Sequence, residues 1–288
     1  MSLNNQLTTA SRSIERSLKI GPRQARLESR MLMSSMLDKQ ISWLIAHPET
    51  LLSAAQTASY KKLVERRLAG EPIAYITGKQ EFYNIELKIS ASVLIPRPET
   101  EILVETALCR LPEHQPLEIL DLGTGSGSIA LCLAKLRPNW IITATDLSDE
   151  ALDVAQKNAR RLGLDQVRFI KADWFLGLEK KCFDCILSNP PYIALNDPHL
   201  ARLNFEPPQA LISGEDGLDA LRNIIKNAHQ HLHSGGLLVC EHGYDQGQAC
   251  HELFYTSGFT NVMCIKDLAG LDRVTYGKTN PVSNQPAA

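Results

Sequence analysis

The chain has 288 residues, of which 44% are hydrophobic and 22% charged, so its length suits about two domains with sizeable cores. A net charge of −2 and a pI near 6.5 argue against binding of a polyanion through bulk charge, although a local basic patch is compatible with them. No apolar run approaches the roughly 18 residues of a membrane span, and the polar start Ser2 to Gln6 does not resemble a signal peptide, so we expect a cytoplasmic protein without membrane partners.

Residues 1–72 predict a small helical bundle. Apolar residues recur at helical spacing in two stripes, Ala25, Leu32, Met33 and Met36 and then Tyr60, Leu63, Val64 and Leu68. Gly70 and Pro72 then end the second helix, in the order expected at a helix C-terminus. We interpret the bundle as a substrate-recognition domain, with a lid that packs on the next domain as the alternative.

Residues 73–95 predict a β-hairpin linker. Within it, residues 82–89 alternate between apolar and polar side chains in the manner of a half-buried strand. The next segment contains two prolines and then opens a helix with Glu99 and Glu101 near its start, which complements the positive end of the helix dipole.

Residues 96–280 alternate between strand and helix signals, which predicts a parallel sheet with helices on both faces. Strands are expected at 117–122, 141–146, 167–171, 183–188 and 237–241. The helix after Ser148 has acidic residues in its first turn, an apolar stripe and Gly163 at its end. Ligands in such sheets bind at the carboxyl ends of the strands.

The last strands differ from the others, because 262–265 and 273–276 lie close together in the sequence after Gly258. They predict a terminal antiparallel pair. Residues 281–288 are expected to form a disordered tail.

A glycine-rich loop follows the first strand of this sheet. Its residues are Gly123, Thr124, Gly125, Ser126 and Gly127. Glycine at every second position lets backbone amides close around an anionic or carboxylate group at the start of a helix. About twenty residues later the second strand ends at Asp146, which is placed to accept hydrogen bonds from ribose hydroxyls.

The loop by itself leaves two cofactors open. Gly125, Gly127 and Ala130 satisfy the G-x-G-x-x-A fingerprint of nicotinamide dinucleotides. S-adenosylmethionine is favoured by Asp121, because a carboxylate just before the loop can face the methionine ammonium, whereas it would repel a pyrophosphate.

Two residues after the third strand are placed to meet an adenine. Asp173 would contact it by a hydrogen bond and Trp174 by packing. Taken alone, Trp174 is more simply explained as part of the core.

The run Ser188-Asn189-Pro190-Pro191-Tyr192 lies where the apolar fourth strand stops. Because Pro190 has a fixed φ and keeps Asn189 out of the helical region, the Asn189 carboxamide and the Pro190 carbonyl are held in defined directions. Two such acceptors suit a planar NH2 group and would stabilise the positive charge that grows on its nitrogen in a transition state, with Tyr192 stacked on the planar group. The alternative is an ordinary turn, because Asn-Pro is a common turn opener.

The glycine loop with Asp121 and Leu122, followed by Asn-Pro-Pro-Tyr, resembles the amino-methyltransferases of the Rossmann-like S-adenosylmethionine class. Adenine-N6 DNA methyltransferases share the tetrapeptide. Further segments resemble the HemK/PrmC-type release-factor glutamine methyltransferases over nearly the whole chain: 72–78, 94–101, 205–207, 210–211, 214–218 and 267–270. One departure is Leu271, where that family usually has arginine before Asp272 and Arg273.

The resemblance implies a seven-stranded methyltransferase domain that uses S-adenosylmethionine and releases S-adenosylhomocysteine. The acceptor would be the glutamine side-chain amide in the Gly-Gly-Gln loop of class I peptide-chain release factors, which act in translation termination. The first domain would help to dock the release factor.

The resemblance also assigns the site residues. The cofactor-binding residues would be Gly123, Thr124, Gly125, Ser126, Gly127, Asp146, Trp174 and Asn189. The substrate-binding residues would be Asn189, Pro190, Pro191 and Tyr192, with Asn189, Pro190 and Tyr192 catalytic.

Other functions remain open on the residues alone. An adenine-N6 methyltransferase acting on DNA or RNA would use the same pair of hydrogen-bond acceptors. The negative net charge of the chain and the lack of a basic stretch with aromatic residues argue against a nucleic-acid partner. A non-catalytic adaptor would have no need of an intact acceptor motif. Glu206 and Asp216 could shape the acceptor pocket or be surface charges.

Metal and disulfide chemistry have weak signals. The seven cysteines are scattered through apolar segments, and the only C-x-x-C, Cys182 to Cys185, lies on a predicted strand. His229 and His233 lie one helical turn apart, but Gln230 stands where a metalloprotease needs glutamate and no third ligand is evident. We therefore expect no metal.

Overall fold

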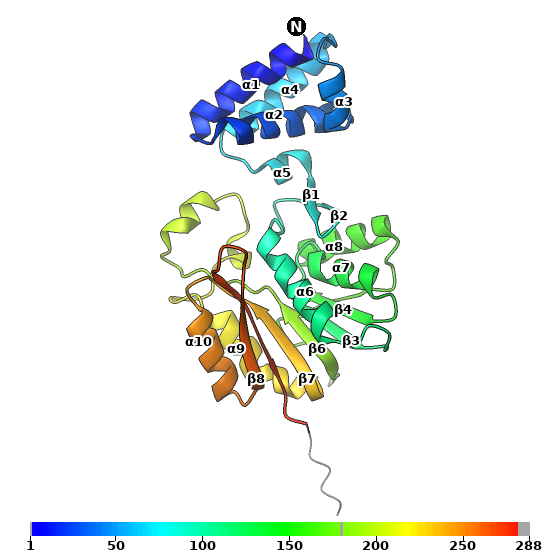
Figure 1. Ribbon diagram of the computed structural model, residues 1–288, viewed down its shortest axis with the longest axis vertical. Helices are drawn as coiled ribbons and strands as arrows, with labels where there is room; N and C mark the ends of the chain where they lie inside the picture. The colour runs from blue at the N-terminus through cyan, green and yellow to red at the C-terminus, as the bar shows by residue number, and fades with distance from the viewer. Residues whose placement is uncertain (1, 179–180, 282–288) are drawn as a thin grey trace, which may run out of the picture. The chain divides into compact units, whose positions relative to one another are not determined.

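The computed structural model describes residues 2–178 and 181–281, and the chain divides into two compact units, Met1–Lys79 and Gln80–Ala288. The first unit is helical, as predicted, and contains α1 (Leu3–Leu18), α2 (Pro22–Leu37), α3 (Ile41–Ala46), α4 (Ala54–Leu68) and α5 (Ile73–Thr77) (Figure 1). Of the predicted tail, residues 282–288 lie outside the described residues.

The first unit packs around a buried apolar core, to which a helix cap and a buried polar contact are added. Ser53 and Gln56 form a reciprocal capping box at the start of α4, which satisfies two backbone donors. Tyr60 is buried in the core of the unit, and its hydroxyl donates to the Ser29 carbonyl at 3.0 Å. Burial raises the pKa of Tyr60 to about 12, so the hydroxyl remains a donor at neutral pH.

A hairpin of β1 (Lys79–Phe82) and β2 (Ile85–Lys88) follows. The predicted hairpin is present, but the strand signal over 82–89 is interrupted, because Tyr83 and Asn84 both adopt positive φ, 45° and 62°, and turn the chain back. Two successive residues in this conformation suit the twist of a two-residue hairpin turn.

The second unit is built on a seven-stranded sheet in the order β5-β4-β3-β6-β7-β9-β8. The strands are β3 (Glu118–Leu122), β4 (Ile141–Asp146), β5 (Arg168–Lys171), β6 (Phe183–Ser188), β7 (Leu232–Glu241), β8 (Thr260–Lys266) and β9 (Asp272–Lys278). The first five are parallel, and β9 pairs antiparallel with both β7 and β8, so the predicted fold class is confirmed. The strand order reverses between β3 and β6, which is where such sheets open a ligand crevice.

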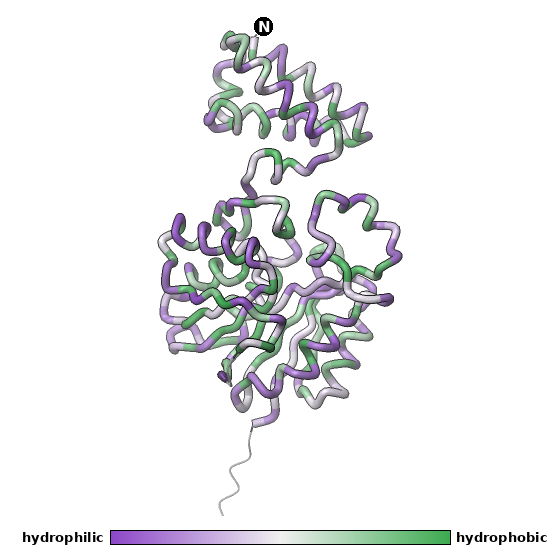
Figure 2. Tube along the Cα trace, turned by 180° about the vertical axis from the view of Figure 1, so that it is seen from behind, coloured by the Kyte–Doolittle hydropathy of each residue, from purple (hydrophilic) through white to green (hydrophobic). Residues whose placement is uncertain are grey.

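Helices cover both faces of this sheet. They are α6 (Glu101–Arg110), α7 (Ser128–Leu136), α8 (Asp149–Leu162), α9 (Asp219–Ala228) and α10 (Gly247–Thr256), with 3-10 turns η1 (Pro98–Thr100), η2 (Pro198–Arg202), η3 (Pro208–Ala210) and η4 (His229–His231). Helices α9 and α10 pack on Leu120 and Leu122, whereas the neighbouring Ile119 points to the opposite face and is also fully buried. Figure 2 shows hydrophobic segments gathered along the strands and hydrophilic ones along the outer helical turns.

None of the helices in the described part of the chain combines the length and apolar character that a membrane span needs.

Candidate active site

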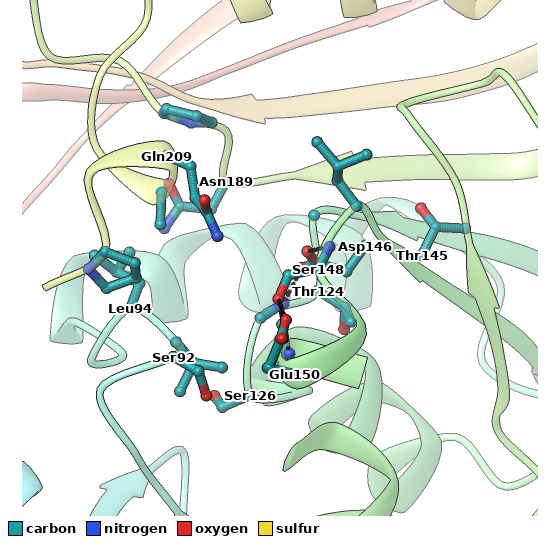
Figure 3. Close-up of a pocket in the computed structure, with 18 of the residues that line it drawn as sticks. Ser92, Leu94, Thr124, Ser126, Thr145, Asp146, Ser148, Glu150, Asn189 and Gln209 are labelled. Atoms are coloured by element: carbon teal, nitrogen blue, oxygen red, sulfur yellow. Dashed lines mark hydrogen bonds between the residues drawn. The ribbon is translucent and has the colours of Figure 1, made fainter. Parts of the chain in front are cut away.

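A cavity of about 380 Å³ opens at the carboxyl ends of β3, β4, β5 and β6. The predicted site residues that line it are Gly123, Thr124, Gly125, Ser126, Asp146, Trp174, Asn189 and Pro191. Figure 3 shows Asn189 and Gln209 on one side of the cavity, with Thr124, Asp146 and Ser148 grouped on another. The structure therefore brings the glycine loop and the acceptor motif to one space.

Three predicted residues do not line the cavity. Gly127 lies at the N-terminus of α7 with a φ of 84°, where an added Cβ would come within 2.9 Å of Leu131 Cδ1. The absence of a side chain at Gly127 permits close packing of α7. The cofactor would contact the preceding loop residues, Gly123 to Ser126, instead of Gly127. Pro190 is buried, and Tyr192 is directed toward Glu241.

The glycine loop has the backbone conformation expected of a cradle. Gly123 and Gly125 adopt φ values of 72° and 56°, which other residues rarely adopt. Among the described residues, no atom lies within 4 Å of the position where Gly125 would carry a Cβ, so space is open beside the loop backbone here. Because the Gly125 amide itself donates to Asp146, this opening offers a ligand close approach to the loop backbone.

Asn158 anchors this loop and was missed by the sequence analysis. Its Nδ2 donates to the carbonyls of Ser126 and Lys88, both at 3.0 Å, and its Oδ1 accepts from the Lys88 amide at 2.7 Å. The side chain is fully buried on α8. Its polar character within the buried face of a predicted helix is the signal that could have found it.

Asp146 is fixed by backbone donors on both sides. Its Oδ2 accepts from the Gly125 amide at 2.9 Å and its Oδ1 from the Ser148 amide at 3.0 Å. Burial raises the pKa of this carboxyl, and these hydrogen bonds oppose the rise. Each oxygen can accept a further hydrogen bond, so the carboxylate retains capacity for the two hydroxyls of a ribose.

Asp121 differs from the expectation that it faces the methionine ammonium. It is fully buried and does not line the cavity; its Oδ2 accepts from Thr124 Oγ1 at 2.6 Å and from the Ala130 amide at 3.2 Å. Among the described residues its Oδ1 has no hydrogen-bond partner. Burial raises the pKa of Asp121 to about 7. Asp121 therefore links the glycine loop to α7 by hydrogen bonds within the protein.

Trp174 fits both interpretations of its role. It lines the cavity beside Asp173 and also packs against the core cluster of β3, β6, β7 and α9. Its φ of 52° is unusual for a bulky residue, and its ring lies 3.8 Å from the position of a Cβ on Gly123. The ring therefore forms a wall between the core and the glycine loop, where an adenine could pack.

The Asn189 carboxamide is held in one orientation. Its Nδ2 donates to Thr100 Oγ1 at 3.0 Å, and Thr100 is itself buried at the start of α6. Within the described part of the chain, no hydrogen bond reaches Asn189 Oδ1, so this oxygen remains available as an acceptor. Thr100 is a second residue that the sequence analysis did not single out.

Tyr192 does not place its ring in the cavity, so the expected stacking on a planar acceptor has no counterpart here. Its hydroxyl donates to Glu241 Oε1 at 3.2 Å, and its carbonyl accepts from Gln246 Nε2 at 3.0 Å. Gly217 approaches the same carbonyl so closely that an added Cβ would lie 2.4 Å from the oxygen. The segment 214–218 thus supports the acceptor motif from outside.

Glu206 and Asp216, whose roles the sequence left open, differ in burial and in position. Glu206 is 5% exposed, accepts from the Ile95 amide at 3.1 Å and pairs with Arg97, so it joins two loops that border the cavity. Asp216 is exposed and pairs with Arg222, which makes it a surface charge. Burial and an interior partner were not visible in the sequence.

The loop with the departure from the family pattern lies between β8 and β9. Asp267 organises it by accepting from the amides of Ala269 and Leu271 and from Arg273 Nε, each at 2.9 Å. The Leu271 side chain is partly exposed and does not line the cavity.

The fold and the cavity define a Rossmann-like methyltransferase. A family model described as a methyltransferase domain matches residues 113–269, and one described as the PrmC N-terminal domain matches residues 10–78. A methyltransferase from Pyrococcus furiosus shares the fold, with a TM-score of 0.54 and 20% identity, covering 75% of this chain and 97% of its own. The protein is an S-adenosylmethionine-dependent methyltransferase.

Two relatives define the family. A release factor glutamine methyltransferase from Xylella fastidiosa (strain 9a5c) is 48% identical over 255 residues, which cover 88% of this chain and 93% of the relative. One from Coxiella burnetii is 43% identical over 276 residues, 96% of each chain. The chain belongs to the release factor glutamine methyltransferase family.

The residues of the cavity fit S-adenosylmethionine. The open space at Gly125 lets its methionine part approach the loop closely, the fixed Asp146 carboxylate suits its ribose, and Trp174 provides a surface for its adenine. The cavity volume is also within the range of small-molecule sites.

Proposed function

We propose that this enzyme transfers a methyl group from S-adenosylmethionine to the side-chain amide nitrogen of the glutamine in the Gly-Gly-Gln motif of class I peptide-chain release factors. The observation that carries the proposal is the Asn189 carboxamide, which borders the same cavity as the glycine loop and has its nitrogen tied to Thr100. An acceptor oxygen beside a cofactor cavity suits an incoming NH2 group.

The chain's own residues would act by orientation. Asn189 Oδ1 and the Pro190 carbonyl would accept the two N–H groups of the glutamine amide, and Pro191 would border it on the cavity side. Both acceptors would favour the nitrogen more strongly as it gains positive charge in the transition state. The cofactor supplies an activated methyl group on a sulfonium, and the residues hold the nitrogen in line with it while water is excluded.

The cofactor-binding roles form part of the same proposal. Gly123 to Ser126 would hold the methionine carboxylate, with Gly127 shaping the loop by allowing α7 to pack closely. Asp146 would hold the ribose and Trp174 the adenine. The Tyr192 ring lies outside the cavity. Tyr192 would therefore hold the acceptor motif in place through its hydrogen bonds with Glu241 and Gln246.

We also assign recognition of the release factor to the first domain, at residues 1–72, followed by a linker and the methyltransferase domain at 96–280. Its charge supports this role: residues 1–79 contain 12 Lys and Arg and 6 Asp and Glu, a net charge of +6, whereas the rest of the chain has 18 and 26, a net charge of −8. A basic domain suits an acidic protein surface and speeds encounter with it. We place the reaction in the cytoplasm, because release factors work on ribosomes.

The test is a labelling experiment with four acceptors. The enzyme is incubated with methyl-labelled S-adenosylmethionine and, separately, a release factor, the same factor with its Gly-Gly-Gln glutamine changed to alanine, DNA, and RNA. We expect label only on the unchanged release factor. Label on either nucleic acid, or equal label on the two forms of the factor, would contradict the proposal.

A further inference from the structure

Glu241 lies behind the acceptor motif, at the end of β7, and is 1% exposed. The Tyr192 hydroxyl donates to its Oε1 at 3.2 Å, and a side-chain hydrogen bond from Thr100 lowers the pKa of the carboxyl against the rise that burial causes. Among the described residues, Oε2 has no partner. Because a buried carboxylate is costly unless neighbours donate to it, both hydroxyl protons are best directed at Glu241.

Thr100 connects this carboxylate with Asn189. A threonine hydroxyl has one proton to donate and lone pairs with which to accept. When the proton is directed to Glu241, only the accepting side of the oxygen remains for Asn189, whose Nδ2 lies 3.0 Å away. The carboxamide must then present its nitrogen to Thr100, which leaves Oδ1 for the cavity that Asn189 borders (Figure 3).

We propose that Glu241 is a positioning residue for methyl transfer, which through Thr100 fixes which end of the Asn189 carboxamide faces the acceptor nitrogen. This role rests on the proposed methylation of an amide. Glu241 itself touches neither the cavity nor the reacting atoms.

The need for such a device follows from the shape of an amide. Its oxygen and nitrogen ends occupy nearly the same space, so packing alone does not choose between them. If the Asn189 carboxamide were turned around, its N–H groups would face the NH2 group of the substrate glutamine, and both groups would be hydrogen-bond donors. The direction of one hydrogen bond at Thr100 therefore decides whether Asn189 presents an acceptor or a donor to the substrate amide.

The first test is Glu241→Gln. Glutamine has nearly the same shape but carries a donor, so it can donate to Thr100 and reverse the hydrogen bond to Asn189. We expect kcat for methylation of the release factor to fall about 10- to 100-fold, because a misdirected group beside the reacting atoms costs roughly this much. The Kd for S-adenosylmethionine, measured by calorimetry, should change less than about threefold.

Variants of Thr100 and Tyr192 separate the two branches from Glu241. Thr100→Val should reproduce the loss in kcat, and Thr100→Ser, which keeps the hydroxyl, should recover most of it. Adding Glu241→Gln to Thr100→Val should cause no further loss, because the effect passes through Thr100. Additive losses, or a Tyr192→Phe variant that alone matches Glu241→Gln, would overturn the proposal.

A readout without turnover distinguishes this proposal from the proposed function. In isotope-labelled enzyme without a release factor, NMR should show slow solvent exchange of the Asn189 side-chain protons, and faster exchange in Glu241→Gln. Equal exchange in both proteins would overturn the positioning role. Failure of the wild-type enzyme to label the release factor would instead overturn the proposed function, and the NMR comparison would still stand.

Discussion

Asp121 and Glu241 are buried carboxyl groups, and each has one oxygen without a hydrogen-bond partner among the residues that the structure describes. Burial raises the pKa of both to about 7, against the opposing effect of the hydroxyls that donate to them. The position of Asp121 before the glycine loop made it a candidate site residue in the sequence. Its burial could not be predicted, because it depends on how the loop folds. Glu241 had no signal, because its partners Thr100 and Tyr192 are distant in the sequence.

The raised pKa of Asp121 predicts how stability varies with pH. A carboxyl group with a folded pKa above its unfolded value of 3.8 stabilises the fold below that value, and this contribution is lost as pH rises through about 7. The free energy of unfolding of Asp121→Asn should therefore improve relative to the wild type between pH 5 and pH 8. Urea unfolding at the two pH values measures this, and a constant difference between the proteins would contradict it.

Asp146 gives a prediction for cofactor binding. Asp146→Ala should weaken the Kd for S-adenosylmethionine roughly 10- to 100-fold, since hydrogen bonds to a charged group contribute about 1.5–3 kcal/mol. Calorimetry measures the change. Asp216→Ala, which removes an exposed carboxylate paired with Arg222, is the matched control and should bind as the wild type does. Equal affinity in all three proteins would remove the ribose role of Asp146.

The order of helices and strands in the second unit followed from hydrophobic periodicity, since each predicted strand overlaps an observed one. The hairpin lies within the predicted linker, but its turn was not located, because Tyr83 and Asn84 lack the glycine that usually marks such a turn. Long-range support of the acceptor motif could not be predicted either. The contact of Gly217 with the Tyr192 carbonyl depends on how the loop after β6 folds back.

Gly217 and Gly235 form a matched pair that tests this support. Both have φ near +78°. A Cβ on Gly217 would lie 2.4 Å from the Tyr192 oxygen, whereas a Cβ on Gly235 would have no atom of the described residues within 4 Å. Gly235→Ala should cost about 1 kcal/mol of stability from backbone strain alone. Gly217→Ala should cost more and also lower methyl transfer. Thermal unfolding and turnover measure both effects, and similar results for the two variants would argue against crowding at Tyr192.

At the scale of the whole molecule, the net charge of −2 conceals a basic first unit and an acidic second one. The total charge of the chain does not reveal this division, which becomes visible only when each unit is counted separately. The first unit also has a groove between α1 and α2, whose charged lining residues are Arg12, Arg26, Arg30 and Glu15. Charges arranged in this way are expected to act on association with a partner more than on chemistry.

Charge reversal in that groove tests recognition by the first domain. Arg12→Glu with Arg26→Glu should lower kcat/KM for the release factor about tenfold or more at low salt and less at high salt, because screening weakens exposed charges. The Kd for S-adenosylmethionine should stay unchanged. Lys61→Glu with Lys62→Glu, on α4, makes the same change in net charge and is the control. Equal losses in both double variants would point to net charge alone.

Methylation by Asn189→Ala shows directly whether this side chain binds the glutamine amide nitrogen beside the cofactor. The measurement is transfer of labelled methyl to a release factor in a single turnover, with the cofactor shown to be bound by calorimetry. We predict that the variant binds S-adenosylmethionine within about threefold of the wild type and loses at least about 99% of the transfer rate. Transfer at close to the wild-type rate would contradict the account.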